Sequence, residues 1–454
     1  MLSTHFHTYR DLKFGERAKA YVDSVTVRDR YTISRPYAKW VTVLHEDRDF
    51  AAIQVKADAL LVASIDGVAA NEYAAFVNRL EDIPAQTKNE QVEQTYADWI
   101  QSDPESALPF LVRGQYYIDR AWEARGTGFS DTVSEEQFEL LFNWLGKARV
   151  DLERAYKMNP KDPASSTHLI VVAMGSQLGK EIEQRYFSNA IESMAYYVSA
   201  YSAMLSCLQP KWGGSRESAK NFVETSLEQF DTNPMIVTIQ DSLLYQQRHY
   251  EDGSEDILKR LDVAQDMISK YRILRDLYPT HKGINLKCFI WARRVDDYKL
   301  QFDAASTIGD TYIYSTSFKS LESYHYGRIN AIRNYAKTTE GEERIRLYKE
   351  LIEMAPKWPT PLSDIGGVFW NDGNKEQAFR YYENAAQLGS NYFWMYRTLA
   401  REAMRTRRYE DALKYIERGE PLIKKDIDRQ RFSILRSETE KAIERERSRA
   451  GLRK

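Results

Sequence analysis

A 34-residue internal repeat between Pro359 and Leu422 constrains the fold of this chain more than any other feature. Displacing the segment by 34 residues aligns Ile365 with Leu399, Gly366 with Ala400, Ala378 with Ala412 and Tyr382 with Ile416. Each period has room for two helices and a turn, and a fixed period of this length is typical of a helical-repeat array. The sequence therefore predicts stacked antiparallel helical hairpins.

Small residues recur where the two helices of each hairpin would cross. Gly366 and Ala378 hold these places in the first repeat, and Ala400 and Ala412 hold them in the second. A larger side chain there would overpack the contact and keep the helices apart. The turn at residues 371–374 contains a glycine, which adopts a positive φ angle at little cost.

This arrangement of large and small residues resembles the tetratricopeptide-repeat family. The resemblance is clear over residues 359–422 and partial over 90–178, where Gly114, Ala148, Leu152, Ala155 and Pro160 carry it. It implies an all-α fold, a right-handed α-solenoid of helical hairpins. Helix-closing prolines recur farther along at Pro210, Pro234, Pro279 and Pro356. Because their spacing is irregular between Gly179 and Leu321, we expect about six to eight helical pairs, with longer helices or insertions in the middle.

We divide the chain into four regions. These are an N-terminal region (1–85), an irregular helical-repeat domain (86–320), the tetratricopeptide repeats (321–422) and a charged capping helix with a tail (423–454). Ala18–Val27 and Phe50–Leu61 have helical patterns, so the N-terminal region is expected to be mostly helical. Arg28–Leu44 is rich in β-branched and aromatic residues, and a short β element is the alternative there.

The C-terminal region carries a thin apolar stripe in a highly charged sequence. Ile427, Ile434, Leu435 and Ile443 form this stripe. A terminal helix with one apolar side and a polar outer face is what the end of a solenoid requires for solubility.

A second motif, Lys211-Trp212-Gly213-Gly214-Ser215, lies between two predicted helices. Residues 122–230 resemble an uncharacterised bacterial domain family with a basic-Trp-Gly-Gly-Ser motif, and the resemblance implies no particular activity. Glycines before a helix can cradle a phosphate, but the lysine that follows the glycines of a P-loop is absent. We favour a structural elbow in which Trp212 packs between helices and Ser215 caps the next one.

Composition limits the classes of partner and the compartment. The formal net charge is -2 over 454 residues, which gives no global basic footprint, so we expect no nucleic-acid partner. The two cysteines, Cys207 and Cys288, form no disulfide framework or zinc site, as is usual in a reducing compartment. No apolar run approaches the roughly 18 residues of a membrane span, and the N-terminal residues do not resemble a signal peptide. The sequence predicts a cytoplasmic protein with no membrane partner.

The family resemblance also implies a binding surface, because first helices line the concave face of these solenoids. Carried onto this chain, the lining positions include Trp370, Asn371, Trp394, Arg397, Arg401 and Arg405, with Thr360, Ser363, Gly367 and Met404 beside them. The three arginines are spaced four residues apart, so they form one row along a helix. Guanidinium groups beside tryptophans suit a carboxylate or an acidic peptide segment. A solvated or internally paired charged face is the alternative.

No motif indicates a catalytic or metal site. His5 and His7 could bind a metal, but no third ligand is near them in the sequence, and a flexible terminus is the favoured interpretation. His168, His249, His281 and His325 are scattered along predicted helices. Metalloprotease, nucleophile-elbow, kinase and dinucleotide-binding motifs are absent from the sequence. We therefore predict no cofactor, no metal and no catalytic residue.

The leading hypothesis is a scaffold or adaptor that binds a partner protein on the concave face of the solenoid. One form of it is a bacterial immunity protein that neutralises a toxin, which the sequence permits without supporting. The alternative is an enzyme or nucleotide-responsive regulator, whose aromatic-rich pocket would lie in the middle or the N-terminal region. The sequence gives no indication of the oligomeric state.

Overall fold

The computed structural model describes residues 32–33, 36–84, 87–128, 130–247, 257–313, 315, 317 and 320–451. The chain divides into two compact units, each treated separately below. The N-terminal unit is Ser34–Ile284, and the C-terminal unit comprises Met1–Ile33 and Asn285–Lys454. The helix predicted over Ala18–Val27, together with His5 and His7, lies outside the described residues.

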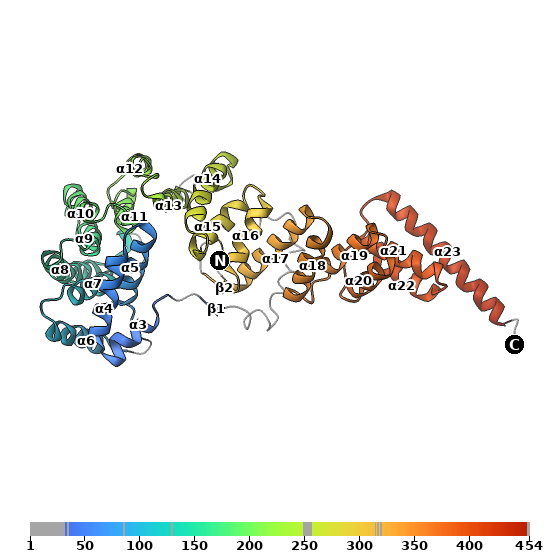
Figure 1. The fold of residues 1–454 in the computed structure, drawn as a ribbon, viewed down its shortest axis with the longest axis horizontal. Helices are drawn as coiled ribbons and strands as arrows, with labels where there is room; N and C mark the ends of the chain where they lie inside the picture. Colours follow the sequence, from blue (N-terminus) through green and yellow to red (C-terminus); the bar gives the residue numbers. More distant parts are fainter. Residues whose placement is uncertain are drawn as a thin grey trace. The chain divides into compact units, whose positions relative to one another are not determined.

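The N-terminal unit is a succession of helices joined by short connections (Figure 1). Its helices are α3 (Lys39–Thr42), the π-helix η1 (Val43–Asp47), α4 (Phe50–Ala63), α5 (Gly67–Arg79), α6 (Asn89–Ser102), α7 (Leu108–Arg125), η2 (Ser130–Thr132), α8 (Glu135–Met158), α9 (Pro163–Gly175), α10 (Lys180–Ser193), α11 (Val198–Cys207), η3 (Pro210–Trp212), α12 (Arg216–Leu227), η4 (Pro234–Ile236), α13 (Val237–Gln247), η5 (Ile257–Lys259) and α14 (Leu261–Leu277). Helix α15 (Lys282–Ala292) spans the boundary between the units.

Sequence signals place the ends and crossings of these helices as expected. Ser134 forms the predicted capping box at the start of α8, where its Oγ accepts a hydrogen bond from the Gln137 backbone N–H at 3.3 Å. Helices α7 and α8 pack against each other, and a Cβ added to Gly114 would lie 2.7 Å from Cγ of Leu152. A small residue is therefore required at this crossing, as the partial resemblance over residues 90–178 implied.

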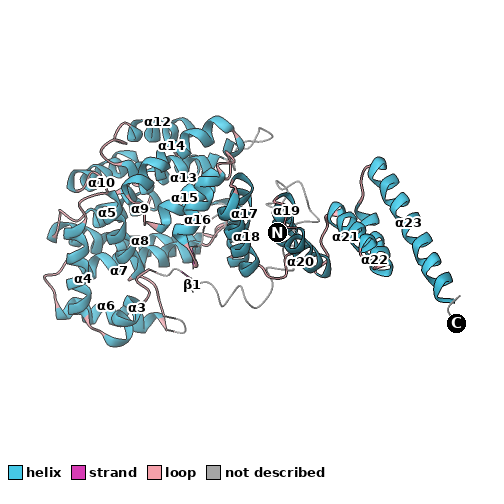
Figure 2. Ribbon diagram, turned by 45° about the vertical axis from the view of Figure 1, so that its right-hand side comes forward, coloured by secondary structure: helices cyan, strands magenta, loops and turns pink. Residues whose placement is uncertain are grey.

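The C-terminal unit contains the remaining helices and a minimal sheet. Its elements are β1 (Thr32–Ile33), α16 (Tyr298–Ile308), β2 (Thr311–Tyr312), α17 (Leu321–Thr338), α18 (Gly341–Met354), α19 (Pro359–Asn371), α20 (Lys375–Gln387), α21 (Phe393–Arg405), α22 (Tyr409–Gly419), η6 (Glu420–Leu422) and α23 (Asp426–Gly451). Strands β1 and β2 pair in parallel, with Thr32 opposite Thr311 and Ile33 opposite Tyr312. Figure 2 shows that helices account for nearly all of the regular structure among the described residues.

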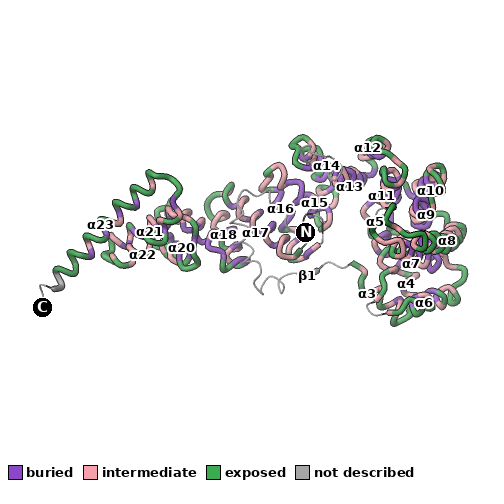
Figure 3. The backbone as a smooth tube through the Cα atoms, turned by 180° about the vertical axis from the view of Figure 1, so that it is seen from behind, coloured by how far each residue is buried: buried purple, intermediate pink, exposed green. Residues whose placement is uncertain are grey.

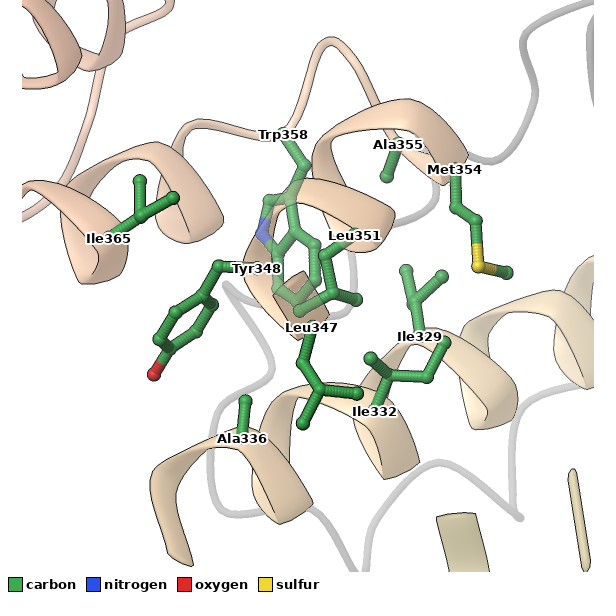
Figure 4. Packing of buried hydrophobic residues seen from close by; sticks show 10 residues of the cluster. All are labelled: Ile329, Ile332, Ala336, Leu347, Tyr348, Leu351, Met354, Ala355, Trp358 and Ile365. Atoms are coloured by element: carbon green, nitrogen blue, oxygen red, sulfur yellow. The ribbon is translucent and has the colours of Figure 1, made fainter. Parts of the chain in front are cut away.

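Helices α17 and α18 form a hairpin inside the region assigned to the tetratricopeptide repeats (321–422) but before the two repeats that the 34-residue alignment identified. Its core includes Ile332 from α17, Leu347 and Leu351 from α18, and Trp358 from the loop before α19 (Figure 4). Trp358 is only 4% exposed. Because Ile365 of α19 belongs to the same cluster, the next hairpin stacks on this one through shared apolar contacts.

The predicted all-α solenoid of tetratricopeptide-like hairpins is confirmed, and the 34-residue repeat corresponds to α19–α22. Gly366, Ala378, Ala400 and Ala412 are all buried at the predicted crossings. The turn glycine, Gly373, has a φ angle of 80°, as expected. The buried residues lie along the sides of the helices that face one another (Figure 3).

Two details differ from the sequence-based expectations. The helices between residues 179 and 321 are not longer than the others, since the irregular spacing comes from short helices such as α11 and from the one-turn segments η3, η4 and η5. In α23 the helix buries Phe432, Leu435 and Ile443, whereas Ile427 and Ile434 of the predicted stripe are exposed. Leu435 and Ile443 face the preceding hairpin because a period near 3.6 places Phe432, rather than Ile434, on their side.

Candidate functional site

Helices α17, α19 and α21 are the first helices of three successive hairpins in the C-terminal unit (Figure 1). We call the surface that carries Arg333, Asp364, Tyr392, Arg397 and Arg401 the first-helix surface. The hairpins stack because α18 packs on α19 and α20 packs on α21. The 34-residue spacing therefore predicts that equivalent positions of the three first helices lie on one surface.

A hydrogen-bonded network centred on Arg333 links these three hairpins. Arg333 Nε donates to Asp364 Oδ2 at 2.8 Å, and Arg333 Nη2 donates to the hydroxyl of Tyr392 at 2.7 Å. The Arg333 and Asp364 side chains are only 13% and 14% exposed, so water screens their interaction weakly. The guanidinium also lies over the Trp358 ring, 5.7 Å from its centroid. These contacts fix the orientation of a charged group at the surface.

The network remains charged over the physiological range. Burial alone would lower the pKa of Arg333, but the Asp364 carboxylate outweighs it and the net shift is upward. Burial raises the pKa of Tyr392, and Asp364 raises it further, so the phenol stays protonated. Burial lowers the pKa of nearby Lys337, and Arg333 lowers it further. A second cation therefore stands close to the Arg333 guanidinium.

The predicted arginine row is partly paired within the chain. Nη1 of Arg397 lies 3.5 Å from Oδ1 of Asp428 on α23, and the Arg397 side chain is 24% exposed. Arg405 donates two hydrogen bonds to Glu402, at 2.8 and 2.5 Å. Arg401 is exposed and has no carboxylate partner within the part of the chain that the structure describes. Burial lowers the pKa of Arg397, and the charge of Arg401 lowers it further.

The predicted tryptophans pack against other aromatic rings. Trp394 stacks on Tyr392 with the ring centroids 5.5 Å apart, and it meets Tyr382 edge-on at 5.6 Å. Trp370 lies edge-on to Phe379 at 5.5 Å. Trp394 thus adjoins the Arg333 network through Tyr392, whereas Trp370 lies at the end of α19 next to Asn371, which is exposed. Partner binding by these residues stays a prediction.

The other predicted lining positions differ in their exposure to solvent. Ser363 is completely buried and its hydroxyl lies 2.9 Å from that of Ser390, so it cannot contact a partner. Thr360, Gly367 and Met404 are partly exposed. A Cβ added to Gly367 would meet no atom closer than 3.9 Å, which leaves open space beside Trp394.

The sequence analysis missed Arg333, Lys337, Asp364 and Tyr392. The 34-residue register contained a signal for two of them: counting back from Arg401 through Gly367 reaches Arg333, and counting back from Arg405 through Asn371 reaches Lys337. At these two positions of the repeat, α17 carries Arg333 and Lys337, α19 carries Gly367 and Asn371, and α21 carries Arg401 and Arg405. Asp364 and Tyr392 give no such signal, because their role depends on contact with Arg333.

The Lys211–Ser215 motif forms the structural elbow that we favoured. Ser215 Oγ accepts a hydrogen bond from the Ser218 backbone N–H at 2.9 Å and so caps α12. A Cβ on Gly214 would collide with the backbone carbonyl of Leu208 at the end of α11. Trp212 packs edge-on against Trp122, with the ring centroids 5.3 Å apart.

Both cysteines are buried free thiols, and we expect them to be unreactive. Burial raises the pKa of Cys207 to about 12, and only a thiolate attacks disulfide reagents rapidly. Titration of the native protein with a chromogenic disulfide reagent is expected to label neither cysteine within minutes, whereas the protein in denaturant releases two equivalents. Rapid labelling of Cys207 or Cys288 in the native protein would contradict the packing described above.

No protein-family model matches this chain. No curated protein matches it either. Solved structures with similar helical repeats include a human IFIT1 dimer with m7Gppp-AAAA, at 15% identity, covering 71% of this chain and 72% of that one, with a TM-score of 0.29. The TPR domain of P58(IPK) is 11% identical, covers 88% of this chain and 99% of that one, and has a TM-score of 0.22. By its helices the chain has a tetratricopeptide-like helical-repeat fold. The resemblance of residues 122–230 to a bacterial family stays a prediction.

The exclusion of nucleic acid as a partner was wrong. The similar solved structures include IFIT1 with m7Gppp-AAAA and with PPP-AAAA. The exclusion rested on the net charge of the whole chain, which averages over surfaces of opposite sign and does not report the charge of any one of them. Arg125 and Lys211, for example, both lie within 6 Å of the Trp212 ring, at 5.9 and 5.8 Å.

The described residues contain neither a membrane-spanning helix nor a cluster of metal ligands. No helix in this part of the chain is long and apolar enough to cross a membrane. No group of three or more histidine, cysteine, aspartate or glutamate side chains within it could hold a metal ion.

Proposed function

We propose that this protein is a helical-repeat scaffold whose first-helix surface binds an acidic segment of a partner protein. The observation that carries the proposal is Arg401, an exposed cation without a carboxylate partner among the described residues. It stands one helical turn from Arg397, whose pKa it lowers. An incoming carboxylate would relieve this repulsion between like charges.

The Arg333 network supports a second anchor point on the same surface. The guanidinium is held by Asp364 and Tyr392, so little side-chain entropy is lost when a ligand contacts it. Lys337 adds a second positive charge beside it. Arg333 of α17, Gly367 of α19 and Arg401 of α21 are spaced 34 residues apart, so we expect an extended acidic peptide that lies along the three first helices to meet both cations.

Two features favour a peptide over RNA at this surface. The faces of the Trp394 ring are partly occupied, because one stacks on Tyr392, and so offer a poor platform for a base. The carboxylates of Asp364 and Glu402 also lie next to Arg333 and Arg405, where they would repel a continuous phosphate backbone. Separate side-chain carboxylates can avoid these positions.

The test uses a fluorescein-labelled peptide of alternating glutamate and alanine and measures fluorescence anisotropy with the full-length protein. Arg401→Glu is expected to weaken binding about tenfold or more, because a charged hydrogen bond of ~1.5 kcal/mol or more is lost and a repulsion is added. The matched control is Arg380→Glu on the second helix α20, where the arginine is 74% exposed and pairs with Glu376. That change is expected to alter the affinity less than about twofold.

Three results would count against the proposal. These are an unchanged affinity in Arg401→Glu, an equal loss in Arg380→Glu, and stronger binding of a single-stranded RNA at the same surface. If the peptide binds as expected, the full-length protein can be used to capture natural partners. The toxin-neutralising role is one form of this activity, and the captured partner would identify it.

A further inference from the structure

A second candidate site lies in the N-terminal unit and is independent of the first-helix surface. It is a cavity of about 270 Å³ whose walls include Trp122, Met174, Gln209, Lys211, Trp212 and Gln246. Trp122, Met174 and Gln246 belong to the last turns of α7, α9 and α13. The cavity therefore lies where the C-terminal ends of three helices meet Lys211 and Trp212 of the structural elbow.

The elbow holds Trp212 in place without any ligand. Lys180 Nζ donates hydrogen bonds to the carbonyl oxygens of Cys207, at 2.7 Å, and Trp212, at 2.9 Å. Gly213, with a φ angle of 77°, and the tightly packed Gly214 fix the backbone that follows. A preformed wall of this kind lowers the entropy that a ligand must overcome on binding.

The chemistry of the walls is specific. Two indole rings meet edge-on at 5.3 Å, and Lys211 lies beside the Trp212 ring. Arg125 also lies near that ring, but it is not a wall residue, and its Nη1 donates to the carbonyl oxygens of Gly126 and Gly128. No wall residue carries a carboxylate. Gln246 Oε1 is buried and accepts no hydrogen bond from the described residues, and such an atom is costly unless an N–H or O–H group reaches it. The walls thus offer an aromatic contact, an unused acceptor and positive charge.

We propose that this cavity binds a nucleotide, with its base against the two indoles and its phosphate at Lys211. An exocyclic amino group of the base would supply the donor that Gln246 lacks. A volume near the lower limit of ~300 Å³ for small-ligand sites suits one base rather than a longer stretch. A free aromatic amino acid fits less well, because its ammonium group would have no carboxylate among the walls.

A free nucleotide and the end of a single-stranded RNA present the same chemistry, and different arms of one experiment distinguish them. Isothermal titration calorimetry of the full-length protein is carried out with AMP, with adenosine, and with the oligonucleotide AAAA. The nucleoside tests the aromatic contact alone, and the difference between AMP and adenosine reports the phosphate. Tighter binding of AAAA than of AMP would identify RNA as the source.

Two variants test the named residues. Lys211 is exposed on the elbow, so Lys211→Glu is expected to leave the fold intact, weaken AMP binding tenfold or more and change adenosine binding less than twofold. Trp212→Leu is expected to weaken both ligands at least fivefold. The control, Lys220→Glu on the exposed side of α12, is expected to leave both affinities unchanged.

The proposal is overturned if neither AMP nor AAAA binds at millimolar concentration. It is also overturned if Lys211→Glu weakens AMP and adenosine equally, since the phosphate would then not lie at Lys211. Because Lys211→Glu is a surface change, its result can be interpreted even if Trp212→Leu fails to fold.

Discussion

Replacing Gly366 by alanine is expected to lower the free energy of unfolding of the C-terminal unit by about 2 kcal/mol. The added Cβ would lie 2.6 Å from two ring carbons of Tyr382 and 3.3 Å from the carbonyl oxygen of Ala378. Tyr382 is only 1% exposed, so its ring has little room to move away. Overpacking at this crossing therefore outweighs the roughly 1 kcal/mol that alanine gains over glycine inside a helix.

Gly146→Ala is the matched control for this substitution. Gly146 also lies inside a helix, α8, but nothing is within 4 Å of an added Cβ. There only the helix propensity changes, so stability is expected to rise by up to about 1 kcal/mol. Opposite signs for the same chemical change would show that the crossing, and not the glycine itself, decides the outcome at position 366. The measurement is urea unfolding followed by circular dichroism, analysed unit by unit.

The cost of Gly366→Ala should nearly vanish when the side chain at position 382 is smaller. The second repeat has Ala400 where the first has Gly366, and Ile416 where the first has Tyr382. Both Ala400 and Ile416 are fully buried, so the smaller side chain across the crossing makes room for the alanine methyl group. In a double-mutant cycle, Gly366→Ala is expected to cost less than about 0.5 kcal/mol when it is added to Tyr382→Ile. Additive losses would contradict a direct clash between these two residues.

The same comparison explains why this part of the fold could be predicted from the sequence. Within each hairpin, a residue of the first helix contacts a residue of the second helix at a fixed separation in the sequence. The sizes of these two side chains are therefore correlated in every repeat. The hairpin α17–α18 keeps the register but not the small residues, since Ile332 and Arg344 stand where Gly366 and Ala378 stand one period later. For that reason the repeat pattern disappears there while the helices remain.

The candidate sites could be predicted only in part. Trp394 and the arginine row follow from position within a repeat, whereas the Arg333 network depends on side chains that meet across three hairpins. The cavity at Trp212 depends on the same kind of contact, because Trp122, Gln209 and Gln246 are far apart in the sequence. The motif indicated where the chain turns, and only the packed structure shows which helix ends surround the turn.

Glu81→Gln is expected to stabilise the N-terminal unit at pH 8 and to have almost no effect at pH 4. Burial, together with the nearby carboxylates of Asp119 and Asp82, raises the pKa of Glu81 to about 9 from an ordinary value of 4.5. Its Oε2 atom is buried and has no hydrogen-bond partner among the described residues. The neutral acid is thus the form that the folded protein favours.

The sign follows from proton binding in the two states. Between about pH 4.5 and 9 the folded protein keeps the Glu81 proton, whereas the unfolded chain loses it, so the folded state binds more protons. Stability from this group is therefore present below pH 4.5 and is lost as the pH rises toward 9. At pH 7 the loss is on the order of 3 kcal/mol, since each pKa unit corresponds to about 1.4 kcal/mol. Glutamine has no proton to lose, so the variant should escape this loss.

Thermal unfolding of the wild type and the Glu81→Gln variant from pH 4 to 9 measures the effect. The difference in unfolding temperature between the two proteins reports Glu81 alone, because the other titratable groups change the stability of both proteins equally. His168 is one such group, since its burial lowers its pKa to about 4 and so reduces stability as the pH falls below 6.5. Glu90→Gln, at an exposed position in the first turn of α6, is the control for replacing a carboxylate by an amide. A difference that does not change with pH for Glu81→Gln would mean that Glu81 is charged in the folded protein.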